Sequence, residues 1–234
     1  MNKKTKSVLW IAGALFLLIY PKLFGIYYAN IVVTFAVYAL YASSLNLLLG
    51  YTGLLSFGHA MYFGTGAYGT ALALTHIPGL PLIPAVLVGF LASVVLALCI
   101  APLVVRVGGN AFAMMHMAFG QLMFVLALKL RDVTGGEDGI QAVPRGFLFG
   151  VIDLWQDINL YYVVLTIFFI GMLVIYRIIH SPFGQVLKAI RENEARAISL
   201  GYNVNRYKLM VFVMSATLAG LAGPPRPSCS SLPR

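Results

Sequence analysis

The stretch from residue 43 to residue 70 carries polar side chains that could meet a solute inside a membrane. Its apolar sequence is interrupted by glycines at positions 50, 53, 58, 64, 66 and 69. Amide, hydroxyl and imidazole groups within a transmembrane segment either bond to neighbouring helices or line a solute path. The candidates for lining such a translocation path, the last of them from a later apolar run, are Asn46, Ser56, His59, Tyr62 and Gln121.

The small residues of this stretch also suit close helix packing. Ser56, Ala60 and Gly64 stand four residues apart, so on a continuous helix they form a small-residue stripe on one face. The stripe predicts tight packing, and the alternative is a broken or re-entrant segment beside a solute path. His59 is more typical of a packed histidine than of a metal ligand, because no second ligand stands at metal spacing.

The segment 181–208 is rich in basic residues and has the pattern of two short helices. Ser181 followed by Pro182 is a typical N-cap and first helical position. Helical spacing puts four apolar residues on one face of the first helix: Phe183, Val186, Leu187 and Ile190. The second helix is expected near 192–200, and Gly201 is placed to end it. Such helices either lie on lipid headgroups or dock another subunit.

A third polar stretch, 131–145, is rich in Asp, Gly and Thr and predicts turns. It lacks the alternating acidic ligands and the terminal Glu of an EF-hand, so calcium binding of that type is not expected. It is either a solvated loop or a docking surface for an external partner.

The elements that must position these residues are membrane-spanning helices. Of the 234 residues, 60% are hydrophobic and only 10% are charged. A soluble domain carries roughly a quarter charged residues, so a cytosolic enzyme, a disordered chain and a secreted disulfide scaffold are excluded. The net charge of +9 lies in short segments between apolar runs, which is typical of topogenic charge and not of nucleic-acid binding. Cys99 and Cys229 give no disulfide framework.

The apolar runs predict an all-α polytopic protein with about six full spans and a shorter seventh. Lipid offers no partner to free backbone groups, so every span must be helical. The expected spans are 8–26, 28–49, 57–75, 80–104, 111–130 and 160–179. A last apolar run, 207–222, is about 24 Å long as a helix, short of a hydrocarbon core near 30 Å.

The charges between the spans predict the orientation. Arg177 and the basic segment 180–208 belong in the cytoplasm by the positive-inside rule, together with the N-terminal lysines and Arg106. The acidic segment 131–159 then falls outside. The number of spans agrees with this, because an even number of six spans returns the chain to the cytoplasm at the basic segment. The N-terminus is therefore expected in the cytoplasm.

The position of the carboxylates bears on the energy source. All seven lie in the two polar segments and none within an expected span. Proton-coupled carriers usually place such a group in the membrane, although His59 and His116 could titrate here. The sequence also lacks G-x-x-x-x-G-K-[ST], so it has no P-loop of its own. A transporter with this sequence is expected to take its energy from another subunit, with sodium coupling through neutral oxygens as an alternative.

Several motifs resemble the permease subunits of bacterial branched-chain amino acid ABC importers of the LivM type. They are GYTGLLSFGHA at 50–60, FGTGAY at 63–68, FAM at 112–114, AFGQ at 118–121, TGGEDGI at 134–140, SPFG at 181–184 and AGLAG at 219–223. The resemblance covers about residues 30–223 in the order of the family.

The resemblance implies an all-helical bacterial inner-membrane subunit that works without a cofactor and does no enzymatic chemistry. Its partners would be a second permease subunit, two ATP-binding subunits and a periplasmic substrate-binding protein. The loop 181–201 resembles the element that contacts the ATPases in this family. The residues that this assigns to the coupling loop are Pro182, Phe183, Gly184, Arg191, Glu194, Ala197 and Gly201.

The family pattern stops at Gly223. Three prolines fall among the next four residues, whereas the family would continue with small and aliphatic residues and further spans. We therefore expect a permease domain over 1–223, shortened at its C-terminal end, and an aberrant tail over 224–234.

The function expected from the sequence is that of a transmembrane permease subunit for branched-chain amino acids or related small polar solutes. Two alternatives stay open. One is a stand-alone secondary carrier or channel, and the other is a non-functional permease fragment.

Overall fold

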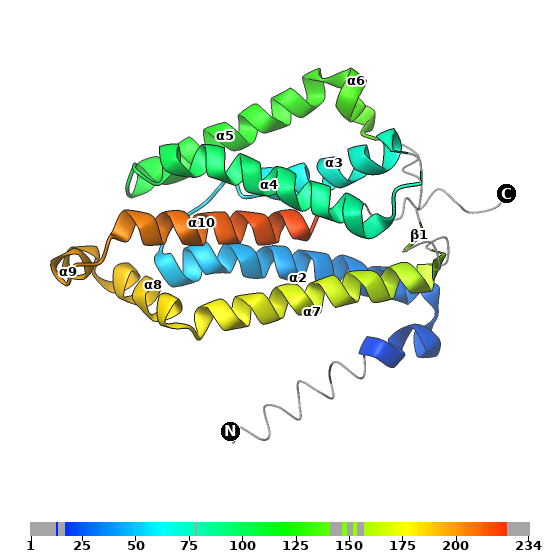
Figure 1. Ribbon diagram of the computed structural model, residues 1–234, viewed down its shortest axis with the longest axis horizontal. Helices are drawn as coiled ribbons and strands as arrows, with labels where there is room; N and C mark the ends of the chain where they lie inside the picture. The colour runs from blue at the N-terminus through cyan, green and yellow to red at the C-terminus, as the bar shows by residue number, and fades with distance from the viewer. Residues whose placement is uncertain are drawn as a thin grey trace.

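The computed structural model is an elongated bundle whose long helices run side by side (Figure 1). It describes residues 17–77, 79–140, 147–148, 152–153 and 157–223, together with Gly13. The tail 224–234 and the beginning of the expected first span lie outside the described residues. Of that span, residues 17–24 form a helix that precedes the glycine at position 25.

Six helices match the remaining apolar runs. They are α2 (Ile26–Thr52), α3 (Ala60–His76), α4 (Leu82–Val104), α5 (Asn110–Lys129), α7 (Asp157–Ile179) and α10 (Val204–Leu221). Among the described residues, α2, α4, α5 and α7 are each long and apolar enough to cross a membrane. The predicted all-α class is confirmed, because backbone groups in lipid must be paired within each helix.

The short elements gather at the two ends of the bundle. One end holds α6 (Arg131–Thr134), the 3-10 helix η1 (Gly136–Asp138) and the antiparallel pair β1 (Phe147–Leu148) and β2 (Ile152–Asp153). In that pair Phe147 faces Asp153 and Leu148 faces Ile152. The opposite end, called here the α8 end, holds α8 (Pro182–Glu192) and α9 (Glu194–Ser199) (Figure 1).

The core is built around α10, which contacts α2, α3 and α4. Its residues Val211, Phe212, Ala216 and Ala219 are fully buried. Glycine permits this packing: a Cβ at Gly66 of α3 would lie 2.1 Å from the carbonyl oxygen of Gly220. Large apolar side chains face outward on the other side of the helices, as expected for a bundle in lipid, among them Phe35, Leu91, Phe124 and Leu173.

The structure corrects the expected start of the third span. Residues 53–59, called here the strap, are not helical, and α3 begins only at Ala60. Gly53 ends α2 in the left-handed region with a φ of 72°, and its neighbour Leu54 donates its N–H to the carbonyl of Leu48. Ser56 therefore does not share a helix face with Ala60 and Gly64, and the expected stripe over these three residues is wrong. The interrupted segment that the glycines also allowed is the one observed.

Because α3 starts late, it covers only part of the bundle. Its 17 residues span about 25 Å, against about 34 Å for the 23 residues of α4 beside it. In Figure 1, α3 begins partway along α4, and the strap leads to it from the α8 end of α2. The first turn of α3 thus lies inside the bundle.

Candidate functional site

The strap carries two buried polar side chains, Ser56 and His59, into the interior. His59 is 1% exposed, and its Nε2 lies 3.1 Å from Ser44 Oγ on α2 and 3.5 Å from Ser215 Oγ on α10. Ser44 Oγ donates to the carbonyl of Tyr41, and Ser215 Oγ donates to the carbonyl of Ser44 at 2.5 Å. Since both hydroxyl hydrogens are used in this way, His59 Nε2 is the donor to the serine oxygens.

A second histidine holds the other polar residue of the strap. His116 of α5 is fully buried, and its Nδ1 lies 2.6 Å from Ser56 Oγ. Its Nε2 lies 3.3 Å from the hydroxyl of Tyr62 on α3. Ser93 of α4 in turn donates to the carbonyl of Tyr62 at 3.1 Å. These contacts join the strap to three further helices.

We call this set the polar cluster: Ser44, Ser56, His59, Tyr62, His116 and Ser215. All six side chains are at most 7% exposed. The ring of Phe212 on α10 covers it, with centroids 5.2 Å from His116 and 5.8 Å from Tyr62. Buried polar groups in an apolar setting must pair, so the cluster fixes how four helices, α2, α3, α5 and α10, meet the strap.

One atom of the cluster is left over. His59 Nδ1 is buried and has no hydrogen-bond partner within the described part of the chain. With Nε2 carrying the hydrogen, Nδ1 is an acceptor. The described residues bring together no group of three or more His, Cys, Asp or Glu side chains that could hold a metal ion.

The predicted path residues are therefore only partly brought together. Ser56, His59 and Tyr62 meet in the polar cluster, whereas Asn46 and Gln121 are exposed on the outer faces of α2 and α5. Sequence reasoning missed Ser44 and Ser215 and noted His116 only as a group that could titrate. A histidine within an apolar segment indicates a buried polar contact, because its imidazole needs hydrogen-bond partners there. The two serines gave no comparable signal in the sequence.

The loop at the α8 end begins as its sequence predicts. Ser181 accepts the N–H of Gly184 at 3.3 Å, and Pro182 is the first residue of α8. A Cβ at Gly184 would lie 2.4 Å from the carbonyl oxygen of Ile179, so this position requires glycine. Leu187 and Ile190 of the predicted apolar face are buried.

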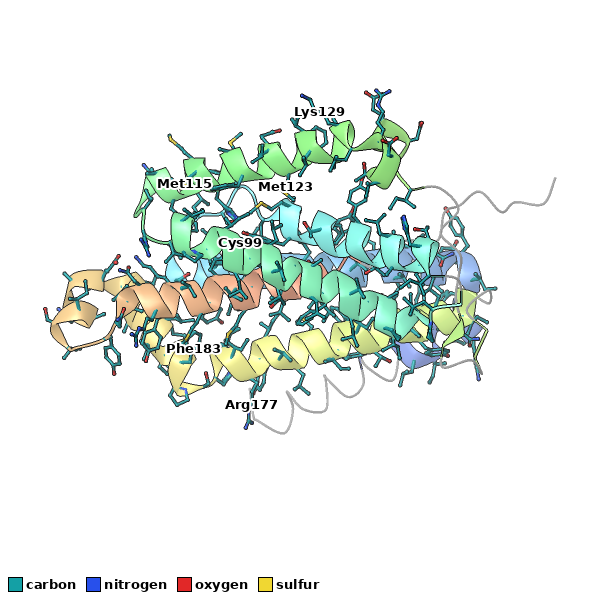
Figure 2. All side chains as sticks on the ribbon, turned by 45° about the horizontal axis from the view of Figure 1, so that its top comes forward. Cys99, Met115, Met123, Lys129, Arg177 and Phe183 are labelled. Carbon is teal, nitrogen blue, oxygen red and sulfur yellow. The ribbon has the colours of Figure 1, made fainter. Side chains whose placement is uncertain are left out.

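The apolar face of α8 packs toward the start of α10. Phe183 points that way in Figure 2, and its ring stacks on Tyr207 with centroids 5.6 Å apart. In the same view Arg177, near the end of α7, points away from the bundle.

The basic side of α8 touches the end of α2. Arg191 Nη1 donates to the carbonyl oxygen of Gly50, and Lys188 Nζ lies 5.7 Å from the centre of the Tyr51 ring. A cation is favourable at a helix C-terminus, where carbonyl groups lack helical partners. These contacts join α8 to the residues that lead directly into the strap.

The second short helix is α9, slightly shorter than expected because Asn193 caps it. The Asn193 side chain accepts the N–H of Arg196 at 2.9 Å. Gly201 has a φ of 85°, and the N–H groups of Gly201 and Tyr202 donate to Ile198 and Ala197. These two bonds form a Schellman motif, so the prediction that Gly201 ends the helix is confirmed.

An ion pair ties α9 to α10. Lys208 Nζ lies 2.7 Å from Glu194 Oε1, and the side chain of Lys208 is 8% exposed against 49% for Glu194. Ala197 is buried beside Ile190 and Val204. The loop is therefore packed on the bundle, while most of its charged side chains face outward.

At the opposite end, the stretch 131–140 forms the expected turns. Thr134 donates to the carbonyls of Ala127 and Leu130 at 2.5 and 2.8 Å. Gly135 has a φ of 77°, and a Cβ there would lie 2.2 Å from the carbonyl oxygen of Gly139. Residues 141–146 lie outside the described residues.

Known proteins resemble the chain in sequence. The family described as "Branched-chain amino acid transport system / permease component" matches residues 27–224. The high-affinity branched-chain amino acid transport system permease protein LivM of Salmonella typhimurium is 31% identical over 209 residues, which cover 80% of this chain and 49% of that protein. BraD of Pseudomonas aeruginosa, named as a permease of the same kind, is 27% identical over 79% of this chain and 64% of its own length.

An archaeal relative extends the comparison. The probable branched-chain amino acid transport permease protein LivM of Methanocaldococcus jannaschii is 24% identical over 82% of this chain and 65% of its own length. No solved structure gives a significant match. The chain spans about half the length of the LivM proteins of Salmonella typhimurium and Escherichia coli.

The family match extends from the start of α2 to the end of α10 and includes the strap, the polar cluster and the loop formed by α8 and α9. The apolar helices and the matched region together indicate a multi-pass membrane bundle with these features. The chain belongs to the family of permease components of branched-chain amino acid transport systems.

Proposed function

We propose that the chain is a transmembrane permease subunit of an ATP-binding-cassette importer for branched-chain amino acids or related small polar solutes. Separate ATP-binding subunits would supply the energy. A periplasmic binding protein would deliver the solute. The observation that carries the proposal is the loop formed by α8 and α9, which presents charged side chains outward and is bonded to the end of α2 on its inner side.

The charges give the proposed orientation in the bacterial inner membrane. Lys188, Arg191 and Arg196 are exposed at the α8 end, so this end would face the cytoplasm. Cysteine labelling tests this in a chain lacking Cys99 and Cys229. A membrane-impermeant maleimide should label Ser199→Cys in inside-out vesicles and not in intact spheroplasts. Labelling in spheroplasts alone would show that the α8 end faces the periplasm and would contradict the proposed orientation.

The outer face of α5 suits a second permease subunit. Among the described spans of the bundle, α5 has the smallest buried share. It exposes Met114, Met117 and Phe124, and also the amide of Gln121, which is costly to leave in hydrocarbon. A neighbouring helical subunit would cover this face and offer a partner to the amide.

Reconstitution tests the proposed function against a stand-alone carrier or channel. The chain would be co-expressed with the ATP-binding subunits, the second permease and the binding protein of an importer of this family and purified through a tag. We expect liposomes with the full complex to take up tritiated leucine only with ATP on the side of the ATPases. Uptake by this chain alone would favour a carrier, and a complete complex that takes up no leucine, isoleucine, valine, amide or urea would refute the proposal.

A further inference from the structure

The strap is held at both of its ends. At its beginning, Arg191 of α8 donates to the carbonyl of Gly50, three residues before the strap, and its Cγ lies 3.4 Å from the position of a Cβ on Gly53. In its middle, Ser56 bonds to His116, and at its far end His59 bonds to Ser44 and Ser215. The strap thus connects the loop to the buried polar cluster.

The strap also has little room to adjust. A Cβ at Gly58 would lie 2.0 Å from the carbonyl oxygen of His116, and one at Gly120 would lie 3.0 Å from the Cα of Gly58. The backbone of the strap therefore rests directly on α5. A displacement at Gly50 and Gly53 cannot be absorbed by loose packing along the strap, because packed protein interiors shift between discrete arrangements instead of deforming continuously.

The contacts of the polar cluster are of the kind that rearranges at moderate cost. They are hydrogen bonds between serine, histidine and tyrosine side chains, and each contributes only modestly to the net stability of a folded protein. His59 Nδ1 is an unused acceptor among the described residues, so the imidazole has a second way to bond when its surroundings move. The cluster can thus hold one arrangement of the bundle and yield to another.

We propose that the strap transmits the position of α8 to the polar cluster, with Arg191 at its beginning and the Ser56–His116 pair at its middle as positioning contacts. A shift of α8 pulls on the end of α2, moves the strap along α5 and changes the hydrogen bonds of His116 and His59. The first turn of α3 follows, because it continues directly from the strap. This inference rests on the proposed function, in which the ATP-binding subunits move α8.

A double-mutant cycle on the reconstituted complex tests the proposal. The measured quantity is tritiated leucine transported per ATP hydrolysed, since a purely structural lesion lowers the yield of complex and both rates together. We expect Arg191→Ala and Ser56→Ala each to lower this ratio about tenfold, and the double variant to be no worse than the more impaired single variant. Arg191→Lys, which keeps a donor, should recover part of the ratio.

The control is Arg177→Ala, which removes an exposed cation of α7 that points away from the bundle (Figure 2). It should leave the ratio unchanged. A double variant whose loss equals the product of the two single losses, about a hundredfold, would overturn the proposal, since the two contacts would then act independently. A single variant with the ratio of the wild type would overturn it as well.

Hydrogen exchange on the chain alone in nanodiscs separates this proposal from the proposed function. We expect Arg191→Ala to speed exchange of the backbone amides of residues 53–59 about tenfold, whereas Arg177→Ala leaves them unchanged. Unchanged exchange of the strap in Arg191→Ala would overturn the link between α8 and the strap. If the wild-type complex takes up no leucine, the proposed function fails, and the exchange measurement still decides whether α8 controls the strap.

Discussion

The polar cluster and the loop of α8 and α9 both interrupt apolar sequence, but they satisfy their polar groups in different ways. In the cluster, bonded side chains come from residues far apart in the chain, such as Ser56 with His116 and Ser215 with the carbonyl of Ser44. In the loop, most bonds are local caps, such as Ser181 with Gly184 and Asn193 with Arg196. Water can solvate polar groups of the loop that have no partner in the protein. In the interior, polar groups must form their hydrogen bonds with other groups of the protein.

The same residue types thus serve two purposes in these two regions. Serine caps a helix at position 181 and joins two helices at position 215. Changes in the interior should therefore lower the stability of the whole bundle, whereas changes in the loop should act locally. Four predictions test this difference, in order of decreasing effect.

Gly66→Ala should cause the largest loss. The new Cβ would lie 2.1 Å from the carbonyl oxygen of Gly220, so α3 and α10 must separate. Overpacking of this severity costs about 3 kcal/mol of the free energy of unfolding. The matched control on the same helix is Gly64→Ala, where nothing lies within 4 Å and the better helix propensity of alanine gains up to about 1 kcal/mol. Thermal unfolding in detergent measures both, and equal melting temperatures would contradict the close contact.

Ser215→Ala should lower the free energy of unfolding by about 1–2 kcal/mol. It removes the donor to the buried carbonyl of Ser44 and a partner of His59. Thr217→Ala on the same helix removes an exposed hydroxyl and serves as the control. The same unfolding experiment applies, and a Ser215 variant no less stable than the Thr217 variant would remove the distinction between interior and surface.

Gly201→Ala should cost about 1 kcal/mol, confined to the loop. A residue with a Cβ is strained at a φ of 85°. Gly108→Ala is the control, because nothing lies within 4 Å of that position and its φ is not positive. Hydrogen exchange should rise in α9 while the melting temperature of the bundle changes little. A large drop in the melting temperature would show that the loop is part of the global folding unit.

Glu194→Gln should have the smallest effect, about 0.5 kcal/mol. It removes the charge that pairs with Lys208, but the half-exposed position of Glu194 weakens the pair through solvent screening. The loss should shrink further as salt is raised. Thermal unfolding at low and high salt measures it, and a large effect that persists at high salt would place this pair with the interior cluster instead of the loop.

The sequence was most informative where structure is local. The spans expected at 80–104 and 111–130 correspond to α4 and α5 within two residues at each end. The N-cap at Ser181, the buried face with Leu187 and Ile190, and the C-terminal glycine at 201 were all predicted correctly. Each rests on hydropathy, helical spacing or a cap, which depend on neighbours within a few residues.

The strap, in contrast, is not predicted by local sequence. Residues 54–59 mix apolar residues with Ser56, Gly58 and His59, much as the helix that follows mixes apolar residues with glycine and threonine. Hydropathy therefore does not separate this segment from α3. The helix starts late because Ser56 and His59 bond to His116, Ser44 and Ser215 on other helices, and Gly58 lies against the backbone of α5. These partners are known only once the helices are packed.

By itself, the sequence determined that this chain is a bundle of membrane helices with a basic loop, because lipid and water select residues by polarity along each segment. It also carried the motifs of its family. Only the tertiary structure decided that Ser56, His59 and Tyr62 meet while Asn46 and Gln121 do not, and that Arg191 touches the end of α2. The physical reason is that these contacts join residues that local sequence does not relate, and only helix packing brings them within hydrogen-bonding distance.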